Sequence, residues 1–158
     1  MNKFKYSLLA FILITGTLFT ACSSDDDAPI PVNEEEVITT LTATLTPTSG
    51  GTAITLQSRD LDGDGPDAPV VTVSGDLTAA TTYTGSVVLL NETETPAENI
   101  TTEVEEEDDE HQFFYTTNAS LDLTTAGFNL DGNGNVLGTT FTVTTGAAST
   151  GTYTITLR

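Results

Sequence analysis

The sequence predicts an all-β fold, and three observations carry this prediction. Threonine provides 33 of the 158 residues, and β-branched and aromatic residues, which suit pleated strands, fill the stretches between acidic clusters. Apolar and polar residues alternate in short segments bounded by Gly, Asn, Asp and Pro, as in strands with one buried face. The uneven spacing of these segments favours a sandwich over an up-and-down barrel. We therefore expect an antiparallel β-sandwich of immunoglobulin-like type with about eight strands, without the Cys and Trp signature of antibody domains.

The alternating segments run from residue 37 to residue 157. In the first segment, alternate residues from Val37 to Leu45 form an apolar face, and the residues between them form a face rich in threonine. Ser49-Gly50-Gly51 then predicts a turn. Further strands are expected at residues 54–56, 71–73, 83–89, 112–116, 121–123, 139–145 and 152–157. Between two of them, residues 129–135 hold one carboxylate and the pair Asn133-Gly134, so this segment predicts a hairpin turn.

One segment departs from the strand pattern and predicts a short helix near residues 96–109. Thr95-Pro96-Ala97-Glu98 forms a capping box with Pro at the first helical position, and Ile100 and Val104 follow four residues apart. The expected C-terminal turn, residues 105–110, is entirely acidic. Negative charge at that end opposes the helix dipole by about 0.3 to 1 kcal/mol per group. Either the end frays or a cation relieves it.

The N-terminal segment has the pattern of an export signal. Lys3 and Lys5 precede thirteen uncharged, mostly apolar residues, 7–19, which span roughly 20 Å as a helix and so fall short of a hydrocarbon core of about 30 Å. The run ends in Phe19-Thr20-Ala21-Cys22, which resembles the lipobox of bacterial lipoproteins. That resemblance implies lipidation of Cys22. We expect a signal peptide at 1–21, an acidic lipidated tether at 22–36 and a single sandwich domain at 37–158.

The residues that follow Cys22 bear on location. Ser23-Ser24-Asp25-Asp26-Asp27 resembles the acidic export signal of surface lipoproteins of the Bacteroidota. The resemblance implies a lipid anchor in the outer membrane and display on the cell surface. The alternative is a solvated acidic tether on a protein that faces the periplasm.

Charge limits the partners. After Cys22 only Arg59 and Arg158 oppose all 23 acids, a side-chain charge of 2 − 23 = −21. Such a surface repels phosphate backbones, which bind through Lys and Arg. Nucleic acid is thereby excluded as a partner, whereas cations or a basic protein are electrostatically suitable.

The strongest local motif is the loop of residues 60–65, Asp-Leu-Asp-Gly-Asp-Gly. Asp60, Asp62 and Asp64 alternate as the carboxylates of calcium loops do, and glycine permits the sharp turn. An EF-hand would need an acid at position twelve, which is Val71. Calcium is the candidate ligand, and the alternative is an acidic inter-strand turn.

A second, weaker metal candidate is Glu107, Glu110 and His111. On a helix, residues 107 and 111 lie one turn apart and could share an ion. His111 is the only histidine of the chain, so zinc sites built on two or three histidines of one chain are excluded. The alternative is a group of solvated acids that precede a strand.

Catalytic motifs are lacking. His111 has no G-x-S-x-G or comparable serine setting, and no glycine-rich phosphate loop or dinucleotide fingerprint occurs. No Trp is present to line a sugar subsite. We therefore expect a protein that is not an enzyme.

Several segments together resemble a group of short flavobacterial lipoproteins. They are the acidic tether, Glu34–Thr40, Arg59–Gly65, Leu89–Glu92, Glu110–Phe114 and the Thr-Gly ending. Members of this group are often labelled "type 1 periplasmic binding fold superfamily protein", but about 125 residues with period-2 patterning cannot supply two α/β lobes. The resemblance carries over no site residue.

These observations favour one function over two others. We expect a membrane-anchored, surface-displayed, non-catalytic module that binds a protein or small ligand, with calcium as a candidate stabiliser. The alternative is a purely structural envelope lipoprotein, and the third reading is an enzyme.

Overall fold

The computed structural model describes residues 36–63 and 65–158 and confirms an all-β antiparallel sandwich in this part of the chain. The predicted signal peptide, Cys22, nearly all of the tether and Asp64 lie outside the described residues. The nine strands of the described part are β1 (Thr40–Pro47), β2 (Ile54–Arg59), β3 (Val70–Val73), β4 (Thr82–Asn91), β5 (Glu98–Asn99), β6 (Phe113–Thr117), β7 (Leu123–Ala126), β8 (Thr140–Thr145) and β9 (Tyr153–Leu157). The helix is α1 (Ile100–Glu106). No helix among these residues is long and apolar enough to cross a membrane.

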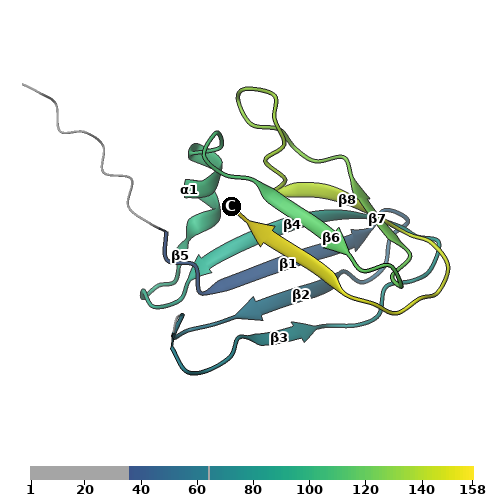
Figure 1. Cartoon of the computed structure of the whole chain (residues 1–158), viewed down its shortest axis with the longest axis horizontal. Coiled ribbons are helices and arrows are strands. Elements are labelled where there is room, and N and C mark those ends of the chain that lie inside the picture. Colours follow the sequence, from purple (N-terminus) through teal and green to yellow (C-terminus); the bar gives the residue numbers. More distant parts are fainter. Residues whose placement is uncertain (1–35, 64) are drawn as a thin grey trace, which may run out of the picture. The chain divides into compact units, whose positions relative to one another are not determined.

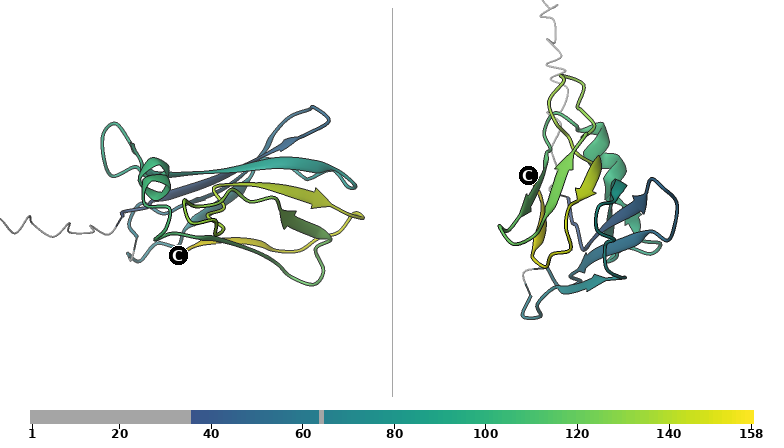
Figure 2. Two further views of the ribbon diagram at one scale, coloured as in Figure 1. Left: turned by 90° about the horizontal axis from the view of Figure 1, so that it is seen from above. Right: turned by 90° about the vertical axis from the view of Figure 1, so that its right-hand side faces the viewer.

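The strands form two sheets of unequal size. The larger has the order β3-β2-β1-β4-β8-β7, with β5 paired to β4, and the smaller consists of β6 and β9. Figures 1 and 2 show β6 and β9 lying over the large sheet. Seven strands in one sheet and two in the other is a less even division than the four and three of an immunoglobulin constant domain.

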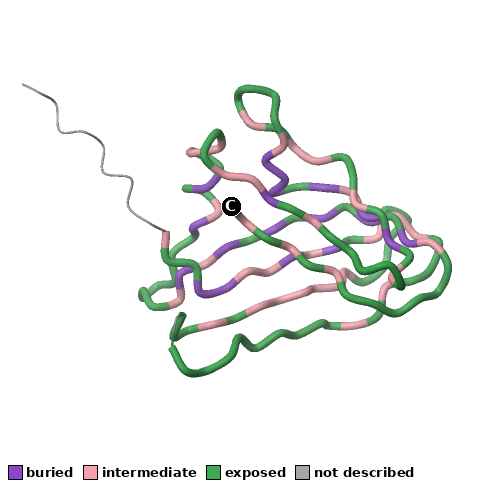
Figure 3. The backbone as a smooth tube through the Cα atoms, viewed as in Figure 1, coloured by how far each residue is buried: buried purple, intermediate pink, exposed green. Residues whose placement is uncertain are grey.

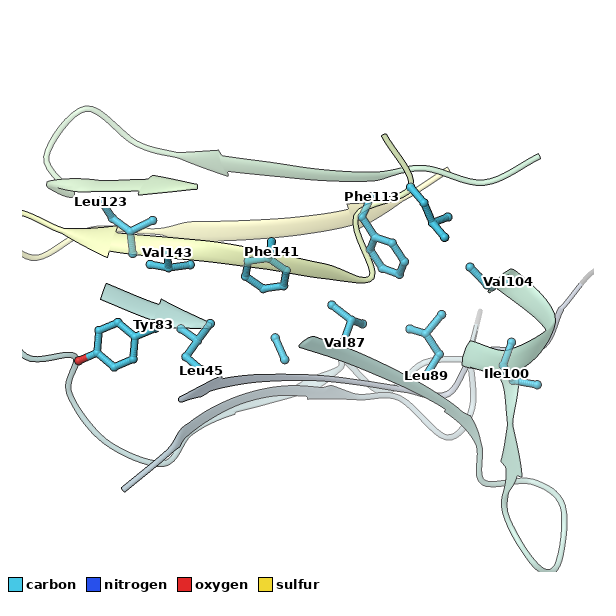
Figure 4. Packing of buried hydrophobic residues seen from close by; sticks show 12 residues of the cluster. Leu45, Tyr83, Val87, Leu89, Ile100, Val104, Phe113, Leu123, Phe141 and Val143 are labelled. Atoms are coloured by element: carbon cyan, nitrogen blue, oxygen red, sulfur yellow. The ribbon is translucent and has the colours of Figure 1, made fainter. Parts of the chain in front are cut away.

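The large sheet curls so that its own strands close the core. Only the first half of β4, Thr82 to Ser86, pairs with β8. Figure 4 shows the side chains of β7 and β8 on one side of the core and those of β1 and β4 on the other, with α1 at one end. The buried core residues are Ala43, Leu45, Tyr83, Val87, Leu89, Ile100, Val104, Phe113, Leu123, Leu137, Phe141 and Val143. Most of them are the inward members of the alternating strands, as a period of two requires, whereas Ile100 and Val104 belong to α1 and Leu137 lies before β8.

A glycine lies where β4 and β8 meet. Gly85 and Phe141 are cross-strand partners, and the Phe141 ring lies so close to Gly85 that a Cβ atom there would overlap it. Phe141 is 3% exposed. The ring occupies the space that a side chain at position 85 would fill. Glycine is therefore required there for steric reasons and not for an unusual backbone angle.

Tyr115 of β6 joins the two sheets through aromatic contacts. Its ring centroid lies 4.4 Å from that of Phe141 and 5.4 Å from that of Phe128. Its hydroxyl donates a 2.5 Å hydrogen bond to the carbonyl of Gly138, so the polar end of this largely buried ring is satisfied. Burial raises the pKa of Tyr115 above its usual range.

The helix is shorter than the predicted 96–109, and the capping box at Thr95 is wrong. Glu98 and Asn99 are extended and pair with Asn91 and Leu90 as β5. Asn99 is the N-cap, since its side-chain oxygen accepts a hydrogen bond from the N–H of Thr101. Pairing with β4 therefore outweighs the local capping signal.

Two features of this region agree with the sequence. Ile100 and Val104 are the buried residues of α1. The helix stops at Glu106 with no basic residue in its last turn, which accords with acids opposing the dipole at that end.

The hairpin turn predicted at residues 129–135 is confirmed. Leu130 and Val136 form an antiparallel bridge, and Gly134 has a φ of 89°. The Asp131 carboxylate accepts hydrogen bonds from the N–H groups of Asn133 and Asn135 and from the Asn135 side chain. Asp131 thus organises a turn, and these bonds, led by that from the Asn135 side chain, lower its pKa.

Gly85→Ala tests the closure of the core. The new methyl group would displace the buried Phe141 ring, and overpacking of this kind costs about 1 to 3 kcal/mol of unfolding free energy. Chemical denaturation measures the loss. Gly132→Ala is the control, because its Cβ would meet nothing closer than 3.9 Å; an equal loss in both variants would contradict the role of the Phe141 contact.

Candidate functional site

The loop of residues 60–65 begins directly after β2 and is held by its own aspartates. The Asp60 carboxylate accepts a hydrogen bond from the N–H of Gly63 at 3.1 Å, and that of Asp62 accepts one from the N–H of Asp67 at 3.2 Å. A Cβ at Gly65 would overlap the Asp62 carboxylate. Both described carboxylates therefore close a turn. Because Asp64 lies outside the described residues, calcium binding here stays a prediction.

An ion pair fixes the point from which this loop leaves the sheet. The Arg59 guanidinium donates to both carboxylate oxygens of Glu92, with Nη2 at 2.6 Å from Oε2. The hydroxyl of Thr40 donates to the same carboxylate at 2.5 Å. These bonds, the one from Arg59 first, lower the pKa of Glu92 to about 2, while the Glu92 carboxylate raises the pKa of Arg59. The pair ties the end of β2 to the segment after β4.

The second predicted set comes together in part and gains a residue from a distant segment. Nε2 of His111 lies 3.0 Å from Oε1 of Glu36 and 3.8 Å from Oε2 of Glu107. Each of the three residues offers one ligand atom, and these atoms lie within 4.8 Å of one another, the one such group of three or more within residues 36–63 and 65–158. Glu110, which the sequence also suggested, is not a member of this group.

The Nε2 atom of His111 is buried and has no hydrogen-bond partner in the described part of the chain. The Glu36 oxygen lies within hydrogen-bonding distance of Nε2. The angle at this contact is unsuitable for a hydrogen bond, however. The His111 and Glu36 side chains are only 12% and 14% exposed. A buried nitrogen that faces carboxylates without a hydrogen bond is an uncommon and costly arrangement, which a cation would relieve.

The surroundings of this group are strongly negative. Glu103 lies one turn before Glu107 on α1, and its pKa is raised, first by burial and then by the charges of Glu36, Glu98, Glu107 and Glu106. α1 also directs its negative C-terminal end toward this region, because Glu107 is its C-cap. The local field therefore favours a positive ion.

Sequence reasoning missed Glu36 because no spacing rule connects it to His111. The two residues are 75 positions apart, which is the difference between their numbers. The acidic run Glu34-Glu35-Glu36 has the composition of a tether, and the sequence predicts a tether that ends at residue 36. Only the fold brings its last member to the end of α1.

A third feature is the open edge of the large sheet at β3. This strand pairs with β2 and is the last strand on its side. All four of its residues are exposed, Val71 by 72% and Val73 by 57%, and Figure 3 shows the strand as an exposed rim. The sequence predicted a strand here but not its exposure.

The register places these valines on the core side of the sheet. Val73 lies opposite Leu56, and Leu56 lies opposite the buried Ala43. Val71 and Val73 therefore continue the apolar inner face beyond the part that β6 and β9 cover.

The same register shows which backbone groups are unpaired. The Ser74 N–H donates to the Thr55 carbonyl at 2.9 Å, and hydrogen-bonded pairs alternate along antiparallel strands. Thr72 and Val70 consequently pair with β2, while Val71 and Val73 direct their N–H and C=O groups to the open edge.

Comparison with family models, curated proteins and solved structures finds no match to this chain.

Acid titration tests the Arg59–Glu92 pair. The pKa of Glu92 falls from 4.5 to about 2 on folding, so its contribution to stability is complete above pH 4.5 and is lost as the pH falls toward 2. We expect Glu92→Gln to be less stable than the parent at pH 7 and to lose less stability between pH 4.5 and 2. Denaturation curves across this range measure both effects. Glu94→Gln, which takes no part in the pair, should behave as the parent; the same behaviour in Glu92→Gln would disprove the assignment.

Proposed function

We propose that this chain is a lipid-anchored, non-catalytic interaction module that binds its partner by adding an extended segment to the edge of β3. The observation that carries this proposal is the open backbone of Val71 and Val73 beside their exposed side chains. A strand with free N–H and C=O groups is a template for another strand.

The composition of β3 supports use of the edge. Sheet proteins protect open edges with Lys, Pro, bulges or inward charges, because unprotected edges recruit other chains. Residues 70–73, Val-Val-Thr-Val, contain no charge and no proline. Pro69 stands before the strand and leaves these four residues available.

Charge determines the kind of partner. Asp60, Asp62 and Asp67 precede β3 and Asp76 follows it, so carboxylates flank both ends of the apolar edge. A second copy of the chain would bring the same negative charge to the interface. The complementary partner is an extended segment with apolar side chains at alternate positions and Lys or Arg at its ends.

The N-terminal features give the setting for this interaction. The segment ending in Cys22 supports a lipid anchor, and Asp25-Asp26-Asp27 supports display at the outer face of the outer membrane. A calcium ion in the Asp60 loop would order the segment that leads from β2 to β3. None of these features requires catalysis.

A labelled peptide tests the edge. Lys-Lys-Val-Thr-Val-Thr-Val-Lys-Lys should bind the full chain in detergent micelles, with fluorescence anisotropy as the measurement and with affinity that falls as salt rises. Val71→Pro removes an open-edge donor but leaves the ladder to β2, so affinity should drop at least about tenfold, a loss of about 1.4 kcal/mol. Val71→Thr keeps the donor and should bind within about twofold of the parent.

Two outcomes would overturn the proposal. One is equal affinity for a peptide with Glu in place of every Lys, and the other is unchanged binding in Val71→Pro. Sedimentation velocity tests whether the edge binds a second copy of the chain. A dimer that dissociates in Val71→Pro would show that it does, and would overturn the assignment of the edge to a basic segment.

Surface display has its own test. Mild protease treatment of intact cells should degrade the chain, and replacing Asp25, Asp26 and Asp27 with Ser should protect it by retaining it inside the outer membrane. Immunoblotting with a periplasmic protein as control measures both. Protection of the unaltered chain in intact cells, with degradation after lysis, would place the module in the periplasm.

A further inference from the structure

We infer that Glu36, Glu107 and His111 form a binding site for a divalent transition-metal ion of the zinc class. The site is independent of the β3 edge. It joins the segment that leads into β1, the C-cap of α1 and the segment that leads into β6.

The distances suit such an ion. Zinc binds His nitrogen at about 2.0 to 2.1 Å and carboxylate oxygen at about 2.0 to 2.2 Å in tetrahedral geometry, which separates neighbouring ligand atoms by roughly 3.4 Å. The His111 Nε2 atom lies 3.0 Å from the Glu36 oxygen and 3.8 Å from the Glu107 oxygen. All three ligand atoms lie within 4.8 Å of one another, so modest side-chain adjustments would bring them to one ion.

The ligand types select the class of metal. Calcium and magnesium take oxygen ligands, whereas one imidazole with two carboxylates suits zinc and its neighbours in the first transition row. Catalytic zinc sites also combine three protein ligands of mixed type with an open fourth position, and the one imidazole and two carboxylates here give the same number of ligands. Three protein ligands leave that position here for water or for a group from a partner.

Burial and charge supply the reason for a cation. Without an ion, the buried Nε2 of His111 lacks a hydrogen-bond partner within the described residues, and two carboxylates lie beside it at the negative end of α1. A divalent ion would satisfy the nitrogen and offset the two charges. The acidic end of α1, which lacks a basic residue in its last turn, would gain a positive neighbour.

The proposed ion would have a structural consequence. Glu36 stands at the junction of the predicted tether and the sandwich, and Glu107 and His111 flank the turn between α1 and β6. Metal binding would therefore link the entry of the domain to the end of α1. Because only the folded chain assembles these ligands, the ion would stabilise the fold.

Cobalt(II) provides the probe, since its visible absorption reports tetrahedral nitrogen and oxygen ligands. The full chain in detergent, stripped with a chelator, should bind one equivalent of Co²⁺ with visible bands that Zn²⁺ displaces and Ca²⁺ at the same concentration does not. Zn²⁺ should also raise the melting temperature. His111→Gln and Glu36→Gln should weaken Zn²⁺ binding at least about tenfold.

Glu106→Gln is the matched control, because it removes one exposed charge from the same helix end without removing a ligand. It should retain the Co²⁺ bands and bind Zn²⁺ within about threefold of the parent. Asp62→Asn should also retain them, which separates this site from the Asp60 loop.

Three results would overturn the inference. They are absence of a one-equivalent Co²⁺ spectrum, equal displacement by Ca²⁺, and an equal loss of affinity in Glu106→Gln and Glu36→Gln, which would mean a diffuse acidic field. Circular dichroism of the metal-free variants confirms that each is folded before its affinity is compared. Peptide binding at β3 is measured separately, so either proposal can fail alone.

Discussion

The packing of the Phe141 ring over Gly85 is the contact on which the two-layer arrangement depends. At this point the large sheet passes from β4 to β8, and the ring fills the space that a side chain on Gly85 would occupy. Tyr115 then packs on Phe141 and brings β6 with it. Because β6 pairs with β9, the second sheet is positioned through this aromatic contact. A small domain has few such contacts, so each one holds a large share of the core.

The same closure determines what stays uncovered. β6 and β9 are two strands facing a much wider sheet, and they cannot cover it to its rim. β3 therefore keeps an apolar inner face and an open backbone edge. In a neutral protein that combination would favour self-association. Here the chain carries 23 acids, and this negative charge opposes the association of two copies and favours a basic segment.

The sequence predicts what depends on local periodicity and misses what depends on long-range pairing. Alternation located the strands that have one buried face, such as β1, β4 and β8, and Ile100 with Val104 identified the helix. The capping box at Thr95 failed because Glu98 and Asn99 pair with the last two residues of β4, and no local signal encodes that pairing. The exposure of Val71 follows from how far β6 and β9 reach. Glu36 and His111 meet for the same reason, since their proximity is a product of topology.

Negative charge connects the proposed metal site with the proposed edge. The described part of the chain has a single ion pair between a guanidinium and a carboxylate, Arg59 with Glu92, so almost all the acids must be stabilised by water, by backbone N–H groups or by ligands. Asp60, Asp62 and Asp131 use backbone N–H groups of their own turns. Glu36 and Glu107 instead lie beside the buried Nε2 atom of His111, which has no hydrogen-bond partner among the described residues. That difference distinguishes a carboxylate that its own loop already satisfies from the cluster that the proposed ion would complete.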